Sequence, residues 1–105
     1  MPEDIFQKIR GQVEGDRIVL YMKGTPSMPQ CGFSQHVVWA LGNVNAKFTA
    51  YDVLSDPALR EGIKQYSSWP TIPQLYVNGE FVGGCDIVMS MLDGGELAKL
   101  VADDA

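Results

Sequence analysis

Residues 74–82 read Gln-Leu-Tyr-Val-Asn-Gly-Glu-Phe-Val, which is the clearest structural signal in the chain. The Asn-Gly pair readily adopts the positive φ angles of a two-residue turn, and β-prone residues flank it on both sides. The run therefore predicts two antiparallel strands joined by a tight turn.

The residues before this hairpin alternate between helical and extended patterns. Residues 5–13 place apolar side chains on one helical stripe, and residues 18–22, Ile-Val-Leu-Tyr-Met, then form a β-rich run. Apolar side chains recur at helical spacing from Phe33 to Leu41, and residues 48–51 have the pattern of a second strand. A strand, a helix and a strand in this order predict a parallel pair.

Helical patterns also lie on both sides of the hairpin. A Ser-Asp-Pro start at residues 55–57 predicts a helix whose apolar face runs to Tyr66. After the hairpin, residues 86–92 and 96–101 are two helical segments separated by glycines. Together these elements predict an α/β fold, thioredoxin-like, with a four-stranded mixed sheet flanked by helices. The chain length of 105 predicts a single domain over residues 1–105.

Composition and charge argue against several classes of function. Thirteen acidic against eight basic residues give a formal net charge of -5, so we expect no nucleic-acid binding. No apolar run approaches the roughly 20 residues of a membrane helix, so we expect no membrane span. The N-terminus lacks the basic and apolar segments of a secretory signal, which predicts a cytoplasmic protein, although a mature organellar form would look the same.

The chain has two cysteines, Cys31 and Cys85, and in a reducing compartment we expect no structural disulfide. Cys31 follows a Gly/Pro/Ser-rich loop at the start of a predicted helix, where N–H groups and the helix dipole would stabilise its thiolate. Lys23, at the end of the first strand, adds a nearby positive charge, and both effects lower a thiol pKa. A thiolate is a nucleophile and a metal ligand, whereas a free cysteine can also be a small buried hydrophobe.

The neighbours of Cys31 limit its chemistry. A dithiol motif needs a second cysteine at the position of Ser34, so thiol chemistry at Cys31 requires a sulfur from elsewhere. Cys85 could approach Cys31, or it could be a small buried residue that offers its backbone N–H. We assign Cys85 to binding rather than to catalysis, and a disulfide between the two cysteines stays open.

Residues 69–73, Trp-Pro-Thr-Ile-Pro, precede the hairpin and predict a binding edge. A proline before an edge strand leaves the preceding residue extended, with N–H and C=O groups that can pair with a peptide. A cis bond before Pro73 would aim Ile72 at Cys31, but the sequence leaves the isomer open. Trp69 by itself is typical of a core residue.

Four motifs in this order closely resemble those of the monothiol glutaredoxins of the Cys-Gly-Phe-Ser type. They are Lys23, residues 31–34, residues 69–73 and residues 83–86, and the similarity runs from about residue 5 to residue 100. The resemblance implies a glutathione-binding protein in which Cys31 is the reactive and metal-binding residue.

The resemblance also implies where glutathione lies. The tripeptide would pair with the backbone of Ile72, and its γ-glutamyl end would meet Cys85 and Asp86. Its glycine carboxylate would face Lys23 and Arg60, which suits a peptide with two carboxylates and one amine. The glutathione site implied in this way comprises Lys23, Arg60, Thr71, Ile72, Pro73, Cys85 and Asp86.

These residues also have simpler interpretations. Lys23 and Arg60 could be solvated surface charges, which contribute little to stability. Asp86 could cap the helix that follows it.

The resemblance further implies a 2Fe-2S cluster that two chains share. Such a cluster takes four ligands, usually thiolates, and with one well-placed cysteine per chain, Cys31, two glutathione thiolates complete the set in a homodimer. In the family such clusters serve storage, transfer and iron signalling, with BolA-like proteins and apo iron-sulfur proteins as partners.

Two other functions remain open at this point. An enzyme could reduce glutathione mixed disulfides through Cys31 alone, with the same thiolate and groove but no metal. The proline-bearing loop before Cys31 and the serine at position 34 favour the cluster carrier. A cofactor-free interaction module that only borrows the fold is the third alternative.

Overall fold

The computed structural model describes residues 2–102, with side chains from residue 4 to residue 102. Its centre is a four-stranded sheet in the order β4-β1-β5-β6. The strands are β1 (Ile18–Met22), β4 (Thr49–Asp52), β5 (Gln74–Val77) and β6 (Glu80–Gly83). Strand β1 is parallel to β4 and antiparallel to β5, and β6 is antiparallel to β5, so the sheet is mixed as the sequence predicts.

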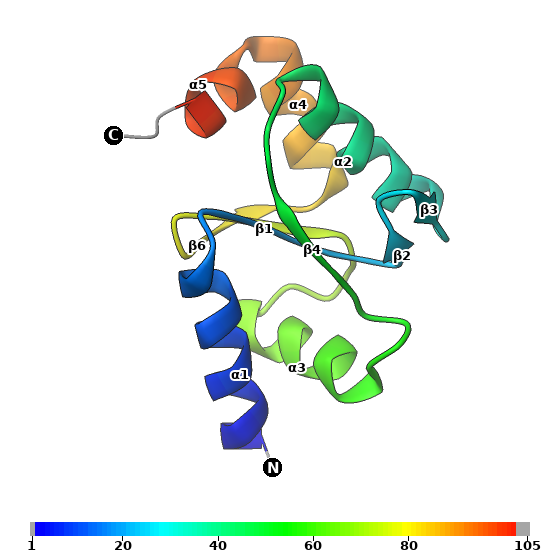
Figure 1. Ribbon diagram of the computed structural model, residues 1–105, viewed down its shortest axis with the longest axis vertical. Coiled ribbons are helices and arrows are strands. Elements are labelled where there is room, and N and C mark those ends of the chain that lie inside the picture. The colour runs from blue at the N-terminus through cyan, green and yellow to red at the C-terminus, as the bar shows by residue number, and fades with distance from the viewer. Residues whose placement is uncertain (1, 103–105) are drawn as a thin grey trace.

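Helices cover both faces of this sheet (Figure 1). The helices are α1 (Pro2–Gly15), α2 (Gly32–Asn43), α3 (Pro57–Ser67), α4 (Cys85–Gly94) and α5 (Glu96–Ala102). Helices α1 and α3 pack on one face, and α2, α4 and α5 pack on the other. The elements follow the predicted order, which confirms the α/β fold.

Two of the sequence predictions, a single domain and no membrane span, concern the whole chain, whereas the structure describes residues 2–102. The prediction of one domain over residues 1–105 stays a prediction, because residue 1 and residues 103–105 lie outside the described part of the chain. No helix within residues 2–102 combines the length and the apolarity needed to cross a membrane.

Strand β1 separates two hydrophobic cores. Ile18, Leu20 and Met22 pack in the core under α2, α4 and α5, whereas Val19 and Tyr21 pack in the core beside α1 and α3. All five side chains are buried. A strand that is covered on both faces must be apolar throughout, which explains why these positions form a continuous β-prone run.

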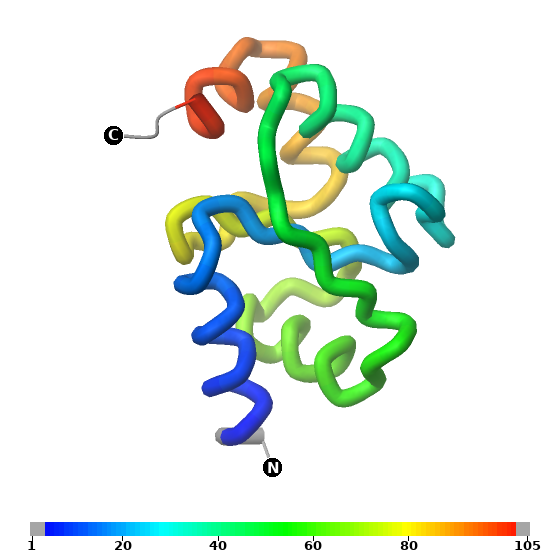
Figure 2. Tube along the Cα trace, viewed as in Figure 1, coloured from blue at the N-terminus to red at the C-terminus, as the bar shows by residue number. Residues whose placement is uncertain are grey.

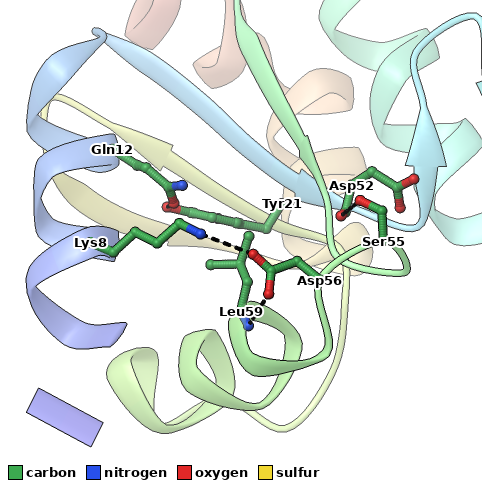
Figure 3. A network of polar contacts seen from close by, with 7 residues as sticks. All are labelled: Lys8, Gln12, Tyr21, Asp52, Ser55, Asp56 and Leu59. Atoms are coloured by element: carbon green, nitrogen blue, oxygen red, sulfur yellow. Dashed lines mark hydrogen bonds and ion pairs between the residues drawn. The ribbon is translucent and has the colours of Figure 1, made fainter. Parts of the chain in front are cut away.

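Polar contacts connect α1 to α3 and to the sheet (Figure 3). Lys8 Nζ lies 3.0 Å from Asp56 Oδ2, and Asp56 caps α3 by accepting a hydrogen bond from the Leu59 N–H at 3.1 Å. The Tyr21 hydroxyl donates to Gln12 Oε1 at 2.8 Å. These contacts fix the start of α3 relative to the sheet.

A small hairpin precedes α2, where the sequence indicates only a loop. Strand β2 (Gly24–Thr25) pairs antiparallel with β3 (Met28–Pro29). Figure 2 shows the chain leaving β1, folding back through this hairpin and entering α2. Asp52, at the end of β4, holds the hairpin, because its Oδ1 accepts hydrogen bonds from the N–H groups of Gly24 and Leu54, each at 2.9 Å.

Replacement of Gly24 by alanine should destabilise the fold. Gly24 has φ +89°, and a Cβ atom there would lie 2.5 Å from the Met28 carbonyl oxygen and 2.7 Å from the Gln30 nitrogen. We expect Gly24→Ala to lower the free energy of unfolding by about 1–3 kcal/mol, measured by urea denaturation.

Gly11 provides the matched control for this substitution. It lies in α1, and a Cβ atom there would meet nothing from the rest of the fold within 4 Å. Gly11→Ala should therefore leave stability unchanged or raise it by up to about 1 kcal/mol. Equal stabilities of the two variants would contradict the close packing at Gly24.

Candidate functional site

A groove of about 530 Å³ lies where β1 ends and where α2 and α4 begin. The structure brings together in this groove every residue that the sequence analysis assigned to the site. They are Cys31, Lys23, Arg60, Thr71, Ile72, Pro73, Cys85 and Asp86.

Cys31 is the N-cap residue of α2, with an extended backbone and no side-chain capping bond. The backbone N–H of Ser34 is the main cause that lowers the pKa of the Cys31 thiol. Burial opposes this effect, and the Phe33 N–H, the Lys23 charge and the Ser34 hydroxyl lower the pKa further. The predicted low pKa is confirmed, with the helix N–H groups contributing more than the lysine.

Ser34 has a structural role that the sequence analysis missed. Its side chain is completely buried, and its Oγ accepts a hydrogen bond from the Lys23 N–H at 3.1 Å. The Lys23 carbonyl accepts a hydrogen bond from the Gln30 N–H at 2.9 Å. The backbone of Lys23 is therefore held on both sides, immediately beside Cys31.

The pKa of Cys85 is shifted in the opposite direction from the pKa of Cys31. Burial raises the pKa of the Cys85 thiol, and the charges of Asp86 and Cys31 raise it further. Cys85 therefore stays protonated at a pH at which Cys31 has ionised. The two cysteines lie in the same groove, and the thiolate form is favoured at Cys31 and disfavoured at Cys85.

Asp86 does not cap α4. The N-cap residue is Gly84, which makes no side-chain capping bond, and Asp86 lies exposed in the first turn of the helix. The interpretation of Asp86 as a helix cap is therefore wrong. Its carboxylate lines the groove instead.

The segment before β5 forms one wall of the groove. The Ile72–Pro73 peptide bond is cis, and both side chains are buried. Outside helices and strands, the backbone hydrogen bonds within residues 2–102 include none to Ile72. Ile72 thus has the unpaired backbone that the sequence predicts for a peptide-binding edge, while its extended conformation stays a prediction.

The groove contains a third cation that the sequence analysis did not assign. Lys64 lies one turn after Arg60 on α3, and its Nζ is 3.6 Å from Glu61 Oε2. The spacing of four residues between Arg60 and Lys64 on a predicted helix is the signal that could have identified it.

Two aromatic residues that the sequence predicts to be in the core line the groove instead. Trp69 is only partly buried and forms part of the wall. Phe33, which the periodicity places on a buried stripe, is 60% exposed. The helical pattern failed for Phe33 because its side chain lines the groove, whereas Val37 and Leu41 on the same helix are completely buried.

Two polar atoms of the groove residues lack partners. Within residues 4–102, neither Arg60 Nε nor Trp69 Nε1 has a hydrogen-bond acceptor, although both atoms are buried. Buried donors are rarely left unpaired. The two unpaired donors therefore favour the binding of a ligand that carries acceptor oxygens.

The described residues do not form a metal site by themselves. Within this part of the chain, no three side chains of His, Cys, Asp or Glu gather closely enough to hold a metal ion. A metal bound at Cys31 would therefore need ligands beyond the side chains of residues 4–102.

Comparison with known proteins identifies the family. Residues 18–82 match the family model for glutaredoxin. The protein named monothiol glutaredoxin-5, mitochondrial, from Lachancea kluyveri is 59% identical over 100 residues, which cover 92% of this chain and 70% of that protein. This chain belongs to the monothiol glutaredoxins.

Solved structures of glutaredoxins agree with this fold. The reduced apo form of poplar GrxS14 superimposes with a TM-score of 0.80 at 49% identity, covering 91% of this chain and 88% of that chain. A buckwheat glutaredoxin solved as a complex with glutathione has a TM-score of 0.86 at 21% identity, covering 97% and 91%. The predicted thioredoxin-like fold is therefore confirmed.

The two thiols of this glutaredoxin should react at different pH values. Alkylation by iodoacetamide requires the thiolate, so Cys31 should reach its half-maximal rate at a lower pH than Cys85. Mass spectrometry of peptides alkylated over a range of pH measures both rates.

Substitution of Lys23 tests the electrostatic part of this difference. Lys23→Ala should move the Cys31 profile to higher pH, because it removes a charge that lowers the pKa. The exposed Lys47 lies outside the groove, and Lys47→Ala should leave the profile in place. Coincident profiles for Cys31 and Cys85 in the wild-type protein would contradict the assignment of Cys31 as the thiolate.

Proposed function

We propose that this glutaredoxin binds glutathione in the groove and carries a 2Fe-2S cluster between two copies of the chain. Its role is then the storage of clusters, their transfer to apo-proteins and iron homeostasis. The observation that carries the proposal is the thiol of Cys31, whose pKa is lowered, in a groove with cations and a carboxylate. This arrangement suits a soft metal ligand beside a charged tripeptide.

The charges of the groove support glutathione as the ligand. The glycine carboxylate would meet Lys23 and Arg60, and the γ-glutamyl amine would meet the carboxylate of Asp86. The cysteinyl residue would pair with the backbone of Ile72, beside Cys31. A glutaredoxin of the same fold, from buckwheat, has been solved with glutathione, which supports the same class of ligand here.

The remaining residues of the proposed site complete the surface around the tripeptide. Thr71 and Pro73 flank Ile72 in the groove wall, and Cys85 offers its backbone N–H in the first turn of α4. The unpaired Nε of Arg60 supplies a further donor for a carboxylate.

The ligand count supports a shared cluster. A 2Fe-2S cluster takes four ligands, usually thiolates. Cys31 would supply one from each chain, and the thiol of one glutathione per chain would supply the rest. Because the pKa of Cys85 is raised, Cys85 is the poorer ligand of the two cysteines.

Partners and compartment complete the proposal. A BolA-like protein and apo iron-sulfur proteins are the proposed partners of the loaded dimer. The name of the relative from Lachancea kluyveri includes the word mitochondrial, so an organellar location stands beside the predicted cytoplasmic one.

Anaerobic reconstitution with iron, sulfide and glutathione tests the function. We expect brown protein with thiolate-to-iron charge-transfer absorption that elutes as a dimer and becomes monomeric when the cluster is lost. Omission of glutathione should prevent assembly. A stable cluster on a monomer, or no cluster in the presence of glutathione, would contradict the proposal.

The two cysteine variants are the matched controls for this experiment. Cys31→Ser replaces a soft ligand by a hydroxyl of far higher pKa and should abolish cluster binding, whereas Cys85→Ser keeps the backbone N–H and should retain most of it. Complete loss of the cluster in folded Cys85→Ser would make Cys85 a ligand. A colourless protein that reduces glutathione mixed disulfides would instead establish the oxidoreductase alternative.

Removal of single charges from the groove should weaken glutathione binding. We expect each of three substitutions to remove one charged contact from a partly exposed site and to raise Kd by roughly two- to fivefold: Lys23→Ala, Arg60→Ala and Asp86→Ala. Isothermal titration calorimetry measures this change, and Lys47→Ala outside the groove is the control. Unchanged affinity in all three groove variants would show that glutathione lies elsewhere.

A further inference from the structure

Gln74 is a polar side chain that the proposed function does not use. It is the first residue of β5, and it is completely buried. Its Nε2 donates hydrogen bonds to the carbonyl oxygens of Trp69 at 3.1 Å and Thr71 at 3.2 Å. Its Oε1 accepts a longer hydrogen bond of 3.4 Å from the Tyr76 hydroxyl. The amide therefore uses both N–H groups and its oxygen.

The two carbonyl groups that Gln74 holds belong to the wall of the groove. Trp69 and Thr71 lie on either side of Pro70, and Ile72 follows directly. This segment is neither helix nor strand. Its first residue is tied to α3, because the Trp69 N–H donates to the Lys64 carbonyl oxygen and to the Ser67 Oγ, each at 3.1 Å. Among the backbone hydrogen bonds outside helices and strands within residues 2–102, none involves residues 70–72.

We propose that Gln74 is a positioning residue for ligand recognition in this groove. Its side-chain amide holds residues 69–72 in the shape that presents the Ile72 backbone to glutathione. Gln74 itself does not line the groove, so it acts through the wall and not by contact with the ligand. This inference rests on the proposed function, because it takes glutathione as the ligand.

The chemistry of this position favours glutamine over other side chains. Two carbonyl oxygens need two N–H donors on one atom, and the Tyr76 hydroxyl needs an acceptor on the same side chain. Ionised glutamate has the acceptors but no donor, and its charge would repel both carbonyl groups. Methionine has similar length but offers no donor, so both carbonyl groups would lose their partner.

The substitution Gln74→Glu should make the affinity for glutathione depend on pH. Burial raises the pKa of a carboxyl group at this position, by up to about 3–5 units, so the carboxyl would be protonated near about pH 6 and ionised near about pH 9.5. The protonated form regains one O–H donor for a carbonyl group. Tyr76 does not titrate in this range, because burial raises its pKa to about 12.

Isothermal titration with glutathione at both pH values tests the inference. Relative to wild type at the same pH, Gln74→Glu should bind about tenfold more weakly at the higher pH and recover part of this loss at the lower pH. Gln74→Met should bind about tenfold more weakly at both. Circular dichroism and thermal unfolding establish that each variant is folded, and Gln74→Met carries the test if Gln74→Glu unfolds at the higher pH.

Gln12→Glu is the matched control for the added charge. Gln12 also accepts a hydrogen bond from a tyrosine hydroxyl, at 2.8 Å, and lies on α1 outside the groove. Its substitution should change the affinity by less than about twofold at either pH.

The possible failures of this experiment are distinguishable. Wild-type affinity in folded Gln74→Met and Gln74→Glu would overturn the inference and leave the proposed function intact. An equal loss at both pH values in Gln74→Glu would overturn the donor role of the amide. Absence of glutathione binding by the wild-type protein would overturn the proposed function and the inference together.

Discussion

The hydrogen bond from the Lys23 N–H to the Ser34 Oγ, 3.1 Å long, joins the end of β1 to the first turn of α2. The sheet ends at Met22, so the next backbone N–H needs an acceptor from outside the strand ladder. Ser34 supplies it from inside the fold, and its own backbone N–H stabilises the Cys31 thiolate. One residue thus binds the backbone just past the end of β1 and contributes the main effect that lowers the pKa of Cys31.

Two helices begin at the groove, yet their first residues behave differently. Cys31 is the N-cap residue of α2 and Cys85 is the first residue of α4, so both lie near the positive end of a helix dipole. At Cys31 the hydrogen bonds from Ser34 and Phe33 outweigh the effect of burial. At Cys85 burial dominates, and Asp86 adds a negative charge. Position at the start of a helix is therefore not enough to lower the pKa of a thiol. The balance between hydrogen bonding and desolvation determines the direction of the shift.

The sequence predicts those features that depend on neighbouring residues. The hairpin around Asn78 and Gly79 and the helix start at Asp56 have local signals, and the structure contains both. The lowered pKa of Cys31 is predictable for the same reason, since the helix N–H groups that lower it are two and three residues away.

Other features depend on contacts between distant segments, which single-sequence patterns do not contain. The β2 and β3 hairpin needs Asp52 from β4, twenty-eight residues after Gly24. Phe33 fits a buried helical stripe, but its side chain lines the groove, and the position of the groove depends on tertiary packing. Trp69 is a residue type that is typical of the core, yet it packs against Phe81 and forms part of the groove wall.

Among the residues that the structure describes, Ser34 and Gln74 are the buried polar side chains of the interior. A buried polar group costs free energy unless every hydrogen bond is made, so an apolar residue would serve the core better at either position. Both side chains instead bind backbone groups that border the groove, at Lys23 on one side and at Trp69 and Thr71 on the other. Neither interaction extends the sheet or a helix. Their burial follows from the need to fix irregular backbone at the site, and the hydrophobic cores tolerate them because each finds its partners there.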